Sequence, residues 1–318
     1  MRIIFMGTPD FAKKSLEAVY NSGYEVVGVV TNPDKPKGRG MKMIASPVKE
    51  FANQHNIPVF QPIKVKGNEE FIGQLKTLNP DVICVVAYGK ILPKDILDIP
   101  EKGCINVHGS LLPQYRGAAP IQWAVLNGEK TTGITTMYMD AGMDTGDMIL
   151  KQEVEIGENE TTGELWDKLA DIGGELLVET LKQIENGTAP RIPQKGEFSL
   201  APMLDKQMAK IDWSMPSKDI KNLVRGLNPI MGAYSFLNNK KIKLWSVEVL
   251  DFKEMPEIKE IEEKQNGTVI LSDSKKGLFI KAKDGIIKVI EIQGENAKKM
   301  LTLDFLRGNE IKEGEILE

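Results

Sequence analysis

The feature that most constrains the fold is an alternation of short apolar runs with helical patterns along the first 188 residues. Arg2–Met6, Glu25–Val30 and Asp81–Ala87 are typical of buried strands, and Asp10–Asn21 is a helical pattern. Strands that alternate with helices favour parallel βαβ units. We therefore expect an α/β domain with a doubly wound, Rossmann-like, mostly parallel sheet. A dinucleotide-binding fingerprint needs three spaced glycines after the first strand. Only Gly7 is present there, so this type of site is excluded.

The pattern changes after residue 188. A stretch rich in Gly and Pro is typical of a linker, and closely spaced short strand patterns follow it. These patterns lie at 233–237, 241–250, 267–271, 278–283 and 286–293. Closely spaced short strands favour a small barrel. We expect three parts: a catalytic domain at 1–188, a linker at 189–208 and a smaller C-terminal OB-like β-barrel domain at 209–318.

The stretch after residue 103 contains the strongest candidate for chemistry. Cys104–His108 is typical of a short buried strand, and a period of two places Asn106 and His108 on the same face. Ligands of open α/β sheets bind beyond the carboxyl ends of the strands. An amide can donate to an oxyanion, and an imidazole can polarise a carbonyl or move protons, so the pair suits acyl transfer. The alternative is that Asn106 caps a turn and His108 is a satisfied strand-end histidine.

Asp140–Asp147 is expected to be a loop and contains three aspartates and two glycines. A calcium loop is the obvious alternative, but the spacing does not fit the EF-hand pattern. We prefer Asp144 as a carboxylate near His108, with the flanking glycines allowing a sharp turn. The histidines, His55 and His108, do not have zinc-site spacing with the cysteines, so we expect no metal.

Several stretches carry a resemblance to a known family. The residues that carry it are Asn106, His108, Ser110–Pro113 and Asp144, together with Met6–Phe11, Thr31–Pro36 and Gly38–Gly40. They resemble the formyltransferases that use 10-formyltetrahydrofolate, and the resemblance covers the whole chain. It is strongest to the members that formylate the α-amino group of initiator methionyl-tRNA. The resemblance therefore implies these two substrates, with the folate consumed as formyl donor and no permanently bound cofactor.

The resemblance also implies roles for individual residues. Asn106 and His108 would donate to the oxyanion, and Asp144 would orient His108 and help to remove the amine proton. The expected folate contacts are Val86, Tyr88, Gly89, Ile91, Leu92, Ser110, Leu111, Leu112, Pro113 and Asp140. Around residues 86–92 the backbone is expected to face the pterin ring. For Ser110 the alternative is a turn cap, and Gln114 and Arg116 can reach either substrate.

Residues 31–49 form a basic segment rich in Pro and Gly. It holds Lys35, Lys37, Arg39, Lys42 and Lys49 against Asp34 alone, and is too polar and too broken to pack. It is either a mobile solvated loop or a flexible finger that orders against phosphates. In the family that the chain resembles, this loop inserts into the tRNA acceptor stem. That implies tRNA contacts from Arg39, with Lys42, Lys35 and Lys37 in support.

Composition is consistent with these expectations but does not require them. The net charge is −4 over 318 residues, so no global basic field indicates nucleic acid, although residues 209–318 carry +1. In the family that the chain resembles, a lysine usually stands at the position of Met203. The resemblance therefore does not extend to a contact between this lysine and RNA phosphate. Cys84 and Cys104 lie in apolar runs, as buried thiols do. No signal-peptide or membrane-span pattern is present, so we expect a cytoplasmic protein without membrane contact. We also expect the protein to be a monomer.

Two other functions stay open at this point. The first is the same chemistry on a small amine, such as a ribonucleotide or a sugar nucleotide. It would need neither the basic segment nor the C-terminal domain. The second is a folate- or nucleotide-binding regulator without turnover. The Asn-x-His pair with a downstream aspartate argues against it, because a protein that only binds its ligand does not need a proton relay.

Overall fold

The computed structural model describes residues 1–37, 41–255 and 260–318. The chain divides into two compact units. The N-terminal unit comprises Met1–Ile121, Thr131–Glu155 and Trp166–Pro202, and the C-terminal unit comprises Gln122–Lys130, Ile156–Leu165 and Met203–Glu318. The expected boundaries at 188 and 208 stay a prediction.

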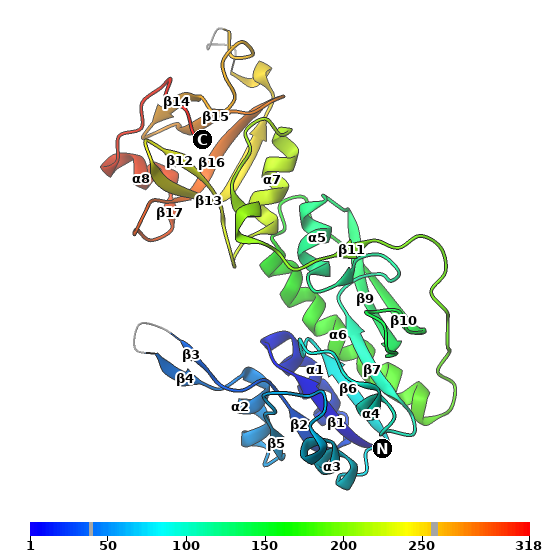
Figure 1. The fold of residues 1–318 in the computed structure, drawn as a ribbon. Coiled ribbons are helices and arrows are strands. Elements are labelled where there is room, and N and C mark those ends of the chain that lie inside the picture. Colours follow the sequence, from blue (N-terminus) through cyan, green and yellow to red (C-terminus); the bar gives the residue numbers. More distant parts are fainter. Residues whose placement is uncertain (38–40, 256–259) are drawn as a thin grey trace. The chain divides into compact units, whose positions relative to one another are not determined.

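A twisted, mostly parallel sheet forms the centre of the N-terminal unit (Figure 1). Its strands run in the order β10-β9-β7-β6-β1-β2-β5. The parallel part consists of β5 (Val59–Phe60), β2 (Glu25–Val30), β1 (Arg2–Gly7), β6 (Val82–Val86) and β7 (Cys104–His108). At one edge, β9 (Thr131–Tyr138) and β10 (Met148–Glu155) pair in the antiparallel sense. The predicted α/β fold with a mostly parallel sheet is confirmed.

Helices connect these strands. They are α1 (Asp10–Asn21), α2 (Pro47–Gln54), α3 (Glu69–Thr77), α4 (Lys94–Leu97), α5 (Pro120–Leu126) and α6 (Thr162–Glu185). Helix α1 buries Phe11, Leu16 and Val19 at helical spacing. The side chain of Ser46 accepts a hydrogen bond from the Lys49 amide and so caps the start of α2. Local sequence signals therefore determine where these helices begin and which face they bury.

Two short strand pairs were not expected from the sequence. In the basic segment, β3 (Lys35–Lys37) pairs with β4 (Lys42–Ile44) in an antiparallel hairpin. In the expected linker, β11 (Leu200–Ala201) pairs in parallel with β8 (Arg116–Gly117). The expectation that residues 31–49 form an irregular loop was wrong for β3 and β4. Backbone hydrogen bonds can form a ladder even where side chains provide no apolar face.

The C-terminal unit is built on an antiparallel sheet in the order β12-β13-β16-β15-β14. The strands are β12 (Ala233–Leu237), β13 (Lys240–Leu250), β14 (Val269–Asp273), β15 (Gly277–Lys281), β16 (Ile286–Gln293) and β17 (Met300–Leu301), which pairs with β16. Helices α7 (Ser217–Gly226) and α8 (Thr302–Gly308) and the 3₁₀ turns Lys206–Ala209 and Phe252–Glu254 complete the unit.

The last residues close this sheet. Glu318 exchanges backbone hydrogen bonds with Phe236 of β12, and Leu317 donates to the carbonyl of Gly267, next to β14. Both edge strands thus gain partners, which is how a small barrel avoids open edges. The predicted fold class, an α/β fold followed by a smaller C-terminal β fold, is confirmed, and the sheet of the C-terminal part is antiparallel.

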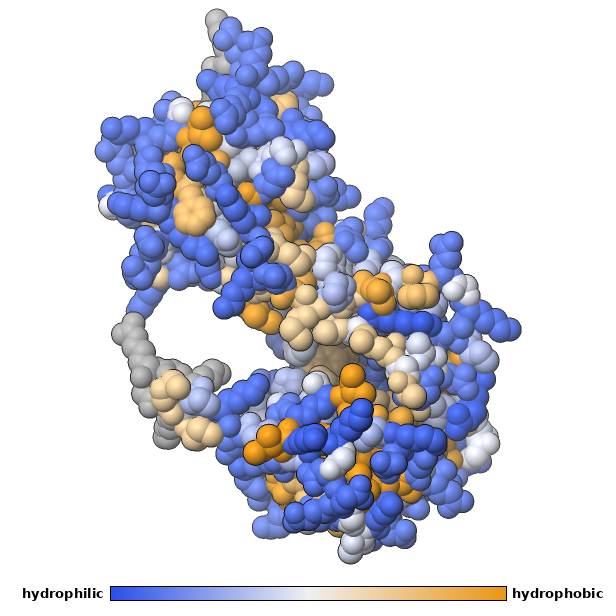
Figure 2. Space-filling view, viewed as in Figure 1, coloured by the Kyte–Doolittle hydropathy of each residue, from blue (hydrophilic) through white to orange (hydrophobic). Residues whose placement is uncertain are grey.

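Each unit has its own apolar core. In the N-terminal unit, Ile4, Met6 and Ile83 are fully buried in the sheet. In the C-terminal unit, Leu244 and Ile280 are fully buried between the strands. Hydrophilic side chains cover most of the visible face of the C-terminal unit (Figure 2). The two units therefore each have the burial pattern of a domain with its own core.

Candidate active site

The three predicted catalytic side chains converge at the end of β7. Asn106 and His108 lie on this strand, and Asp144 lies in the loop between β9 and β10. The Asn106 Nδ2 is 3.5 Å from Asp144 Oδ1, and the His108 Nδ1 is 3.6 Å from Asp144 Oδ2. His108 is 5% exposed and Asp144 is 16% exposed at the side chain. The structure therefore brings together an amide donor, an imidazole and a carboxylate that lie far apart in sequence.

The contacts of His108 assign different roles to its two ring nitrogens. Nε2 lies 2.9 Å from the carbonyl oxygen of Tyr115. Because a carbonyl oxygen can only accept, Nε2 carries a proton and donates it. Nδ1 is then the nitrogen that faces the Asp144 carboxylate. This is the arrangement of an imidazole whose orientation is fixed on one side and whose other nitrogen can exchange a proton.

The Asp144 carboxylate has a third partner besides His108 and Asn106. Its Oδ2 accepts a hydrogen bond of 2.9 Å from the backbone amide of Gly117. The Asp144 backbone has a φ of +53°, in the left-handed region that non-glycine residues rarely adopt. At Gly146, two residues on, a Cβ would lie 1.8 Å from the carbonyl oxygen of Tyr138, so the sharp turn requires glycine there.

The predicted folate residues fall into two groups. Tyr88 and Leu92 are buried in the core, while Ile91 is 82% exposed and Gly89 has a φ of +75°. Burial raises the pKa of the Tyr88 hydroxyl to about 12. In the loop after β6, the side chains of Tyr88 and Leu92 thus point into the core, whereas Ala87 and Ile91 are exposed. The folate contacts of this loop stay a prediction.

The second folate group follows β7. The Ser110 hydroxyl donates 2.5 Å to the Gln114 carbonyl oxygen, within its own turn. Leu112 is fully buried, and its amide donates to the Thr135 hydroxyl at 3.1 Å. Leu111 and Pro113 are half-buried in the same turn. These bonds hold the turn in place, and the folate contacts of Ser110–Pro113 stay a prediction.

Asp140 stands apart from the rest of the predicted folate set. It is exposed, and its Oδ1 accepts from the Gly142 amide at 3.0 Å and from the Thr145 hydroxyl at 2.6 Å. These bonds stabilise the start of the loop that carries Asp144. In the structure, Asp140 therefore organises its own loop.

Several residues near the site were missed by reasoning from the sequence. The Asn32 Nδ2 donates to Thr8 Oγ1 at 3.0 Å and to the Tyr88 carbonyl at 2.9 Å, so Asn32 ties together the loops after β1, β2 and β6. Its position directly after a buried strand was the available signal. Gln194 and Ser199, in the expected linker, also bond to the site loops, and no local pattern in the sequence identifies them.

The predicted tRNA residues lie on the β3–β4 hairpin or next to it. Lys35 is exposed, Lys37 ends β3 and Lys42 begins β4. Arg39 lies outside the described residues. At the base of the hairpin, Lys49 forms a 2.7 Å ion pair with Asp34, and hydrogen bonds from Lys49 and Gln61 lower the pKa of Asp34.

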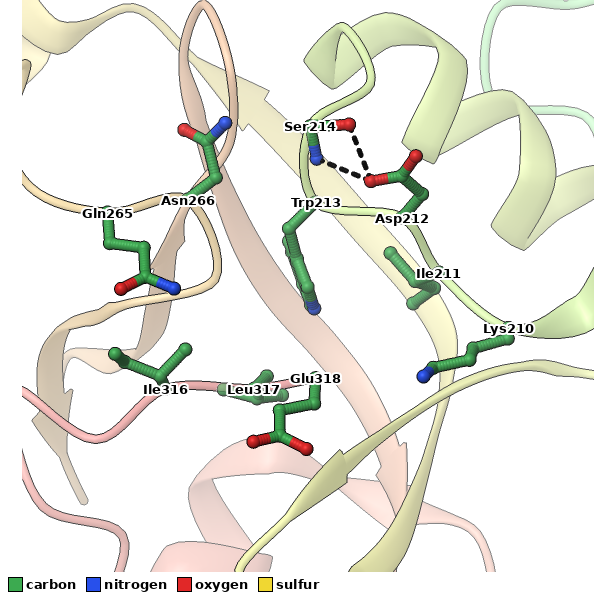
Figure 3. A pocket seen from close by; sticks show the side chains of 10 residues that line it. All are labelled: Lys210, Ile211, Asp212, Trp213, Ser214, Gln265, Asn266, Ile316, Leu317 and Glu318. Carbon is green, nitrogen blue, oxygen red and sulfur yellow. Dashed lines mark hydrogen bonds between the residues drawn. The ribbon is translucent and has the colours of Figure 1, made fainter.

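The C-terminal unit has a hollow of about 540 Å³ (Figure 3). None of the predicted site residues lines it. Asp212 on its rim accepts hydrogen bonds from the amide and hydroxyl of Ser214, which lower the pKa of Asp212. The residues that line this hollow include neither a histidine nor a cysteine.

Within residues 1–37, 41–255 and 260–318, no cluster of at least three His, Cys, Asp or Glu side chains is placed to hold a metal ion. None of the helices in the same ranges combines the length and apolar character needed to cross a bilayer.

Comparisons with known proteins now place the chain. The family described as "Formyl transferase" matches residues 1–181, and "Formyl transferase, C-terminal domain" matches residues 203–310. A methionyl-tRNA formyltransferase from Clostridioides difficile (strain 630) is 52% identical over 318 residues, which cover all of both chains. The chain belongs to the methionyl-tRNA formyltransferase family. The predicted family and the prediction of an enzyme are thereby confirmed.

Solved structures share the fold of this methionyl-tRNA formyltransferase family member. A sugar 3N-formyl transferase, WlaRD, has a TM-score of 0.62 at 19% identity, with 94% of this chain and 99% of that chain covered. HypX from Aquifex aeolicus in complex with tetrahydrofolic acid has a TM-score of 0.62 at 17% identity, with 96% and 47% covered. At these identities the likeness shows the fold alone.

Proposed function

We propose that the protein transfers the formyl group of 10-formyltetrahydrofolate to the α-amino group of initiator methionyl-tRNA. The observation that carries this proposal is the identity of about half of all residues, over the full length, to methionyl-tRNA formyltransferases. The convergence of Asn106, His108 and Asp144 supplies the chemistry that such a transfer needs. The folate is a co-substrate, and no further cofactor is required.

The reaction begins with the amine in its neutral form. A free α-amino group has a pKa of about 7.7 to 8.0, so a useful fraction is neutral near pH 7. Its nitrogen attacks the formyl carbon and forms a tetrahedral intermediate with negative charge on oxygen. Asn106 Nδ2 has two hydrogens, and Asp144 engages one of them at a long 3.5 Å. The amide therefore has a hydrogen to donate to the oxyanion.

The same intermediate must lose a proton from its new nitrogen. We assign this step to the pair formed by His108 Nδ1 and Asp144, since the other ring nitrogen is bonded to the Tyr115 carbonyl. Collapse of the intermediate then breaks the bond to N10 of the folate, and N10 takes up the proton that the His108–Asp144 pair has accepted. Direct donation from His108 to the oxyanion, the other role expected for it, would require one of its two present contacts to open.

For the donor, we propose that the backbone after β6 and the turn after β7 hold the folate. The carboxyl ends of these neighbouring parallel strands meet at one edge of the sheet, as β6 pairs with β7 along Ile83–Val86. The contacting residues would be those expected from the sequence: Val86, Tyr88, Gly89, Ile91, Leu92, Ser110–Pro113 and Asp140.

For the acceptor, we propose that the β3–β4 hairpin binds the acceptor stem. Three apolar side chains of this hairpin are exposed: Met41 at 67%, Met43 at 59% and Ile44 at 42%. Together with the basic residues of the segment, these side chains suit a macromolecular partner rather than solvent. A small amine would need neither feature.

We further propose that one face of the C-terminal barrel contacts the tRNA. Along β12 and β13, half-buried side chains alternate with buried ones, and the outward ones are Tyr234, Phe236, Lys241, Lys243 and Trp245. The Lys241 Nζ lies 3.5 Å from the centre of the Tyr234 ring, and the Lys243 Nζ lies 5.4 Å from the Trp245 ring. Aromatic rings interleaved with cations are what OB-type folds use to bind nucleic acid.

The electrostatics of this face support the same proposal. Burial, and then the nearby charge of Lys241, lower the pKa of Lys243. A phosphate bound between the two ammonium groups would relieve their repulsion. The proposal includes a cytoplasmic location, because charged initiator tRNA is used in translation. It also includes a monomeric state.

One competition assay tests the function. The protein is incubated with labelled 10-formyltetrahydrofolate, initiator methionyl-tRNA and an amino-sugar nucleotide, and label is followed into each acceptor. We expect label in the tRNA fraction alone. Formylation of the sugar nucleotide with the tRNA untouched would favour the alternative acceptor, and the absence of any transfer would overturn the proposal.

A further inference from the structure

A short segment of the expected linker lies against the site loops. Within residues 191–200, all of which are described, Gln194 and Ser199 are half-buried and the others are exposed. These two side chains form hydrogen bonds to the loops of the site, and Arg191 adds a 3.9 Å ion pair with Asp147. The Ser199 Oγ accepts from the Tyr115 amide at 2.8 Å, and Gln194 bonds to both site loops.

The amide of Gln194 uses all of its hydrogen-bonding capacity. Its Nε2 donates to the carbonyl oxygens of Asp144 at 2.8 Å and Gly146 at 2.9 Å. Its Oε1 accepts from the Arg116 Nε at 3.0 Å and Nη2 at 2.7 Å. A glutamine side chain offers two donor hydrogens and two acceptor sites, so no part of this amide is left for solvent or ligand.

These bonds close a ring through the catalytic carboxylate. Gln194 joins the Asp144 backbone to Arg116, and the amide of the next residue, Gly117, donates to the Asp144 side chain at 2.9 Å. Asp144 has a φ of +53°, a strained backbone conformation that persists only where neighbouring contacts determine it. Gln194 supplies contacts of that kind on both sides of the turn.

We propose that Gln194 is a positioning residue for formyl transfer, which holds the Asp144 carboxylate in register with His108 and Asn106. This inference rests on the proposed function of that site. Gln194 does not contact the reacting atoms; it acts through the loop backbone. Small displacements of a catalytic group are costly, because a misplacement of about 1 Å can lower the rate by about 100-fold.

Two variants separate the bonds to Asp144 and Gly146 from the bond to Arg116. Gln194→Met removes the bonds to the two carbonyl oxygens and also the bonds to Arg116. Gln194→Glu keeps an acceptor for Arg116 but has no hydrogen for the two carbonyl oxygens. For both variants we expect kcat to fall by about 10- to 100-fold, with both KM values within about threefold of the parent. The control is Gln152→Ala, an exposed amide on β10 that bonds only to the neighbouring Glu153 carbonyl among the contacts of the described residues.

Three results would overturn the inference. They are a Gln194→Glu variant with parental kcat, a change in KM alone, or a fall in kcat that matches a loss of folded protein in thermal unfolding. A double-mutant cycle gives a further readout that a merely structural role would not move. In an Asp144→Asn background, Gln194→Met should cost less than about threefold, because its effect passes through Asp144. A full additional loss would also overturn it.

Failure of this inference and failure of the proposed function are distinguishable. If Asp144→Asn itself retains normal turnover, the assignment of the site is wrong. If Asp144→Asn loses turnover while Gln194→Met does not, the assignment of the site is retained and only the positioning role of Gln194 is wrong.

Discussion

At the scale of single residues, Asp144 determines the geometry of the site. Its carboxylate faces the His108 Nδ1, the Asn106 amide and the backbone amide of Gly117. A carboxylate in this position orients the imidazole and balances the charge that the imidazole gains when it takes a proton. In the proposed mechanism, Asn106 stabilises the oxyanion and His108 takes part in proton transfer, so the two residues of β7 have separate tasks.

This division of tasks predicts the effect of removing each side chain. We expect Asn106→Ala to lower kcat by about 100- to 1000-fold, since an oxyanion donor is worth roughly that factor. We expect His108→Ala to lower kcat by at least about 100-fold, since a general acid–base group contributes roughly 100- to 10,000-fold. Substrate affinity, measured as the Kd of each substrate, should change far less. His55→Gln is the control, because the described contacts of the His55 ring are with Phe51 and Tyr20, neither of which is a predicted site residue. A His108→Ala variant with near-parental turnover would contradict the site.

At the scale of elements, the β3–β4 hairpin has a fixed base and an exposed distal part. The base is fixed by the ion pair of Lys49 with Asp34, to which Gln61 adds a 2.7 Å hydrogen bond. Exposed Met41 and Met43 lie towards the end of the hairpin. Such an element can present side chains to a partner without any change in the central sheet.

The hairpin therefore predicts an effect on the acceptor alone. Arg39→Ala should lower kcat/KM for methionyl-tRNA, and leave the slow hydrolysis of 10-formyltetrahydrofolate unchanged, since a phosphate contact positions the RNA only. Initial rates of transfer and of hydrolysis measure the two effects. Lys66→Ala, an exposed lysine of the same unit, is the control for loss of charge. Equal loss of both activities would indicate a structural role for Arg39.

At the scale of the whole molecule, charge is distributed so that a chain of net charge −4 can still bind RNA. Residues 209–318 carry +1, and Lys241 and Lys243 lie on one face of their barrel. Local clusters of this kind bind phosphates even when the net charge is negative, because screening limits charge interactions to about 8–10 Å at ordinary ionic strength.

This charge distribution predicts a salt-dependent enzyme. We expect kcat/KM for tRNA to fall as salt is added, and the double substitution Lys241→Gln with Lys243→Gln to make the slope shallower by about two phosphate contacts. A salt titration of both proteins measures the slopes. Lys275→Gln, at an exposed turn between β14 and β15, should change neither slope nor rate. If the salt dependence of kcat/KM had the same slope in the double variant as in the parent, this face of the barrel would not be a tRNA contact.

Much of the fold is already contained in local sequence patterns. Apolar periodicity located β1, β2 and β6, and the pattern at 286–293 coincides with β16. The expected α1 coincides with Asp10–Asn21, because its apolar spacing and turn signals are local. Asn106 and His108 could be paired from the sequence for the same reason, since a period of two is a property of one strand.

The tertiary structure decided what depends on separate segments. Nothing local to residues 191–201 indicates that Gln194 reaches Asp144 or that Leu200 pairs with Arg116. The distance from Asp144 to His108 likewise depends on the pairing of β7 with β9. The sequence by itself thus determined the elements and the types of catalytic group, because these follow from neighbours along the chain. Only the fold determined their relative positions, because those are fixed by contacts between residues distant in sequence.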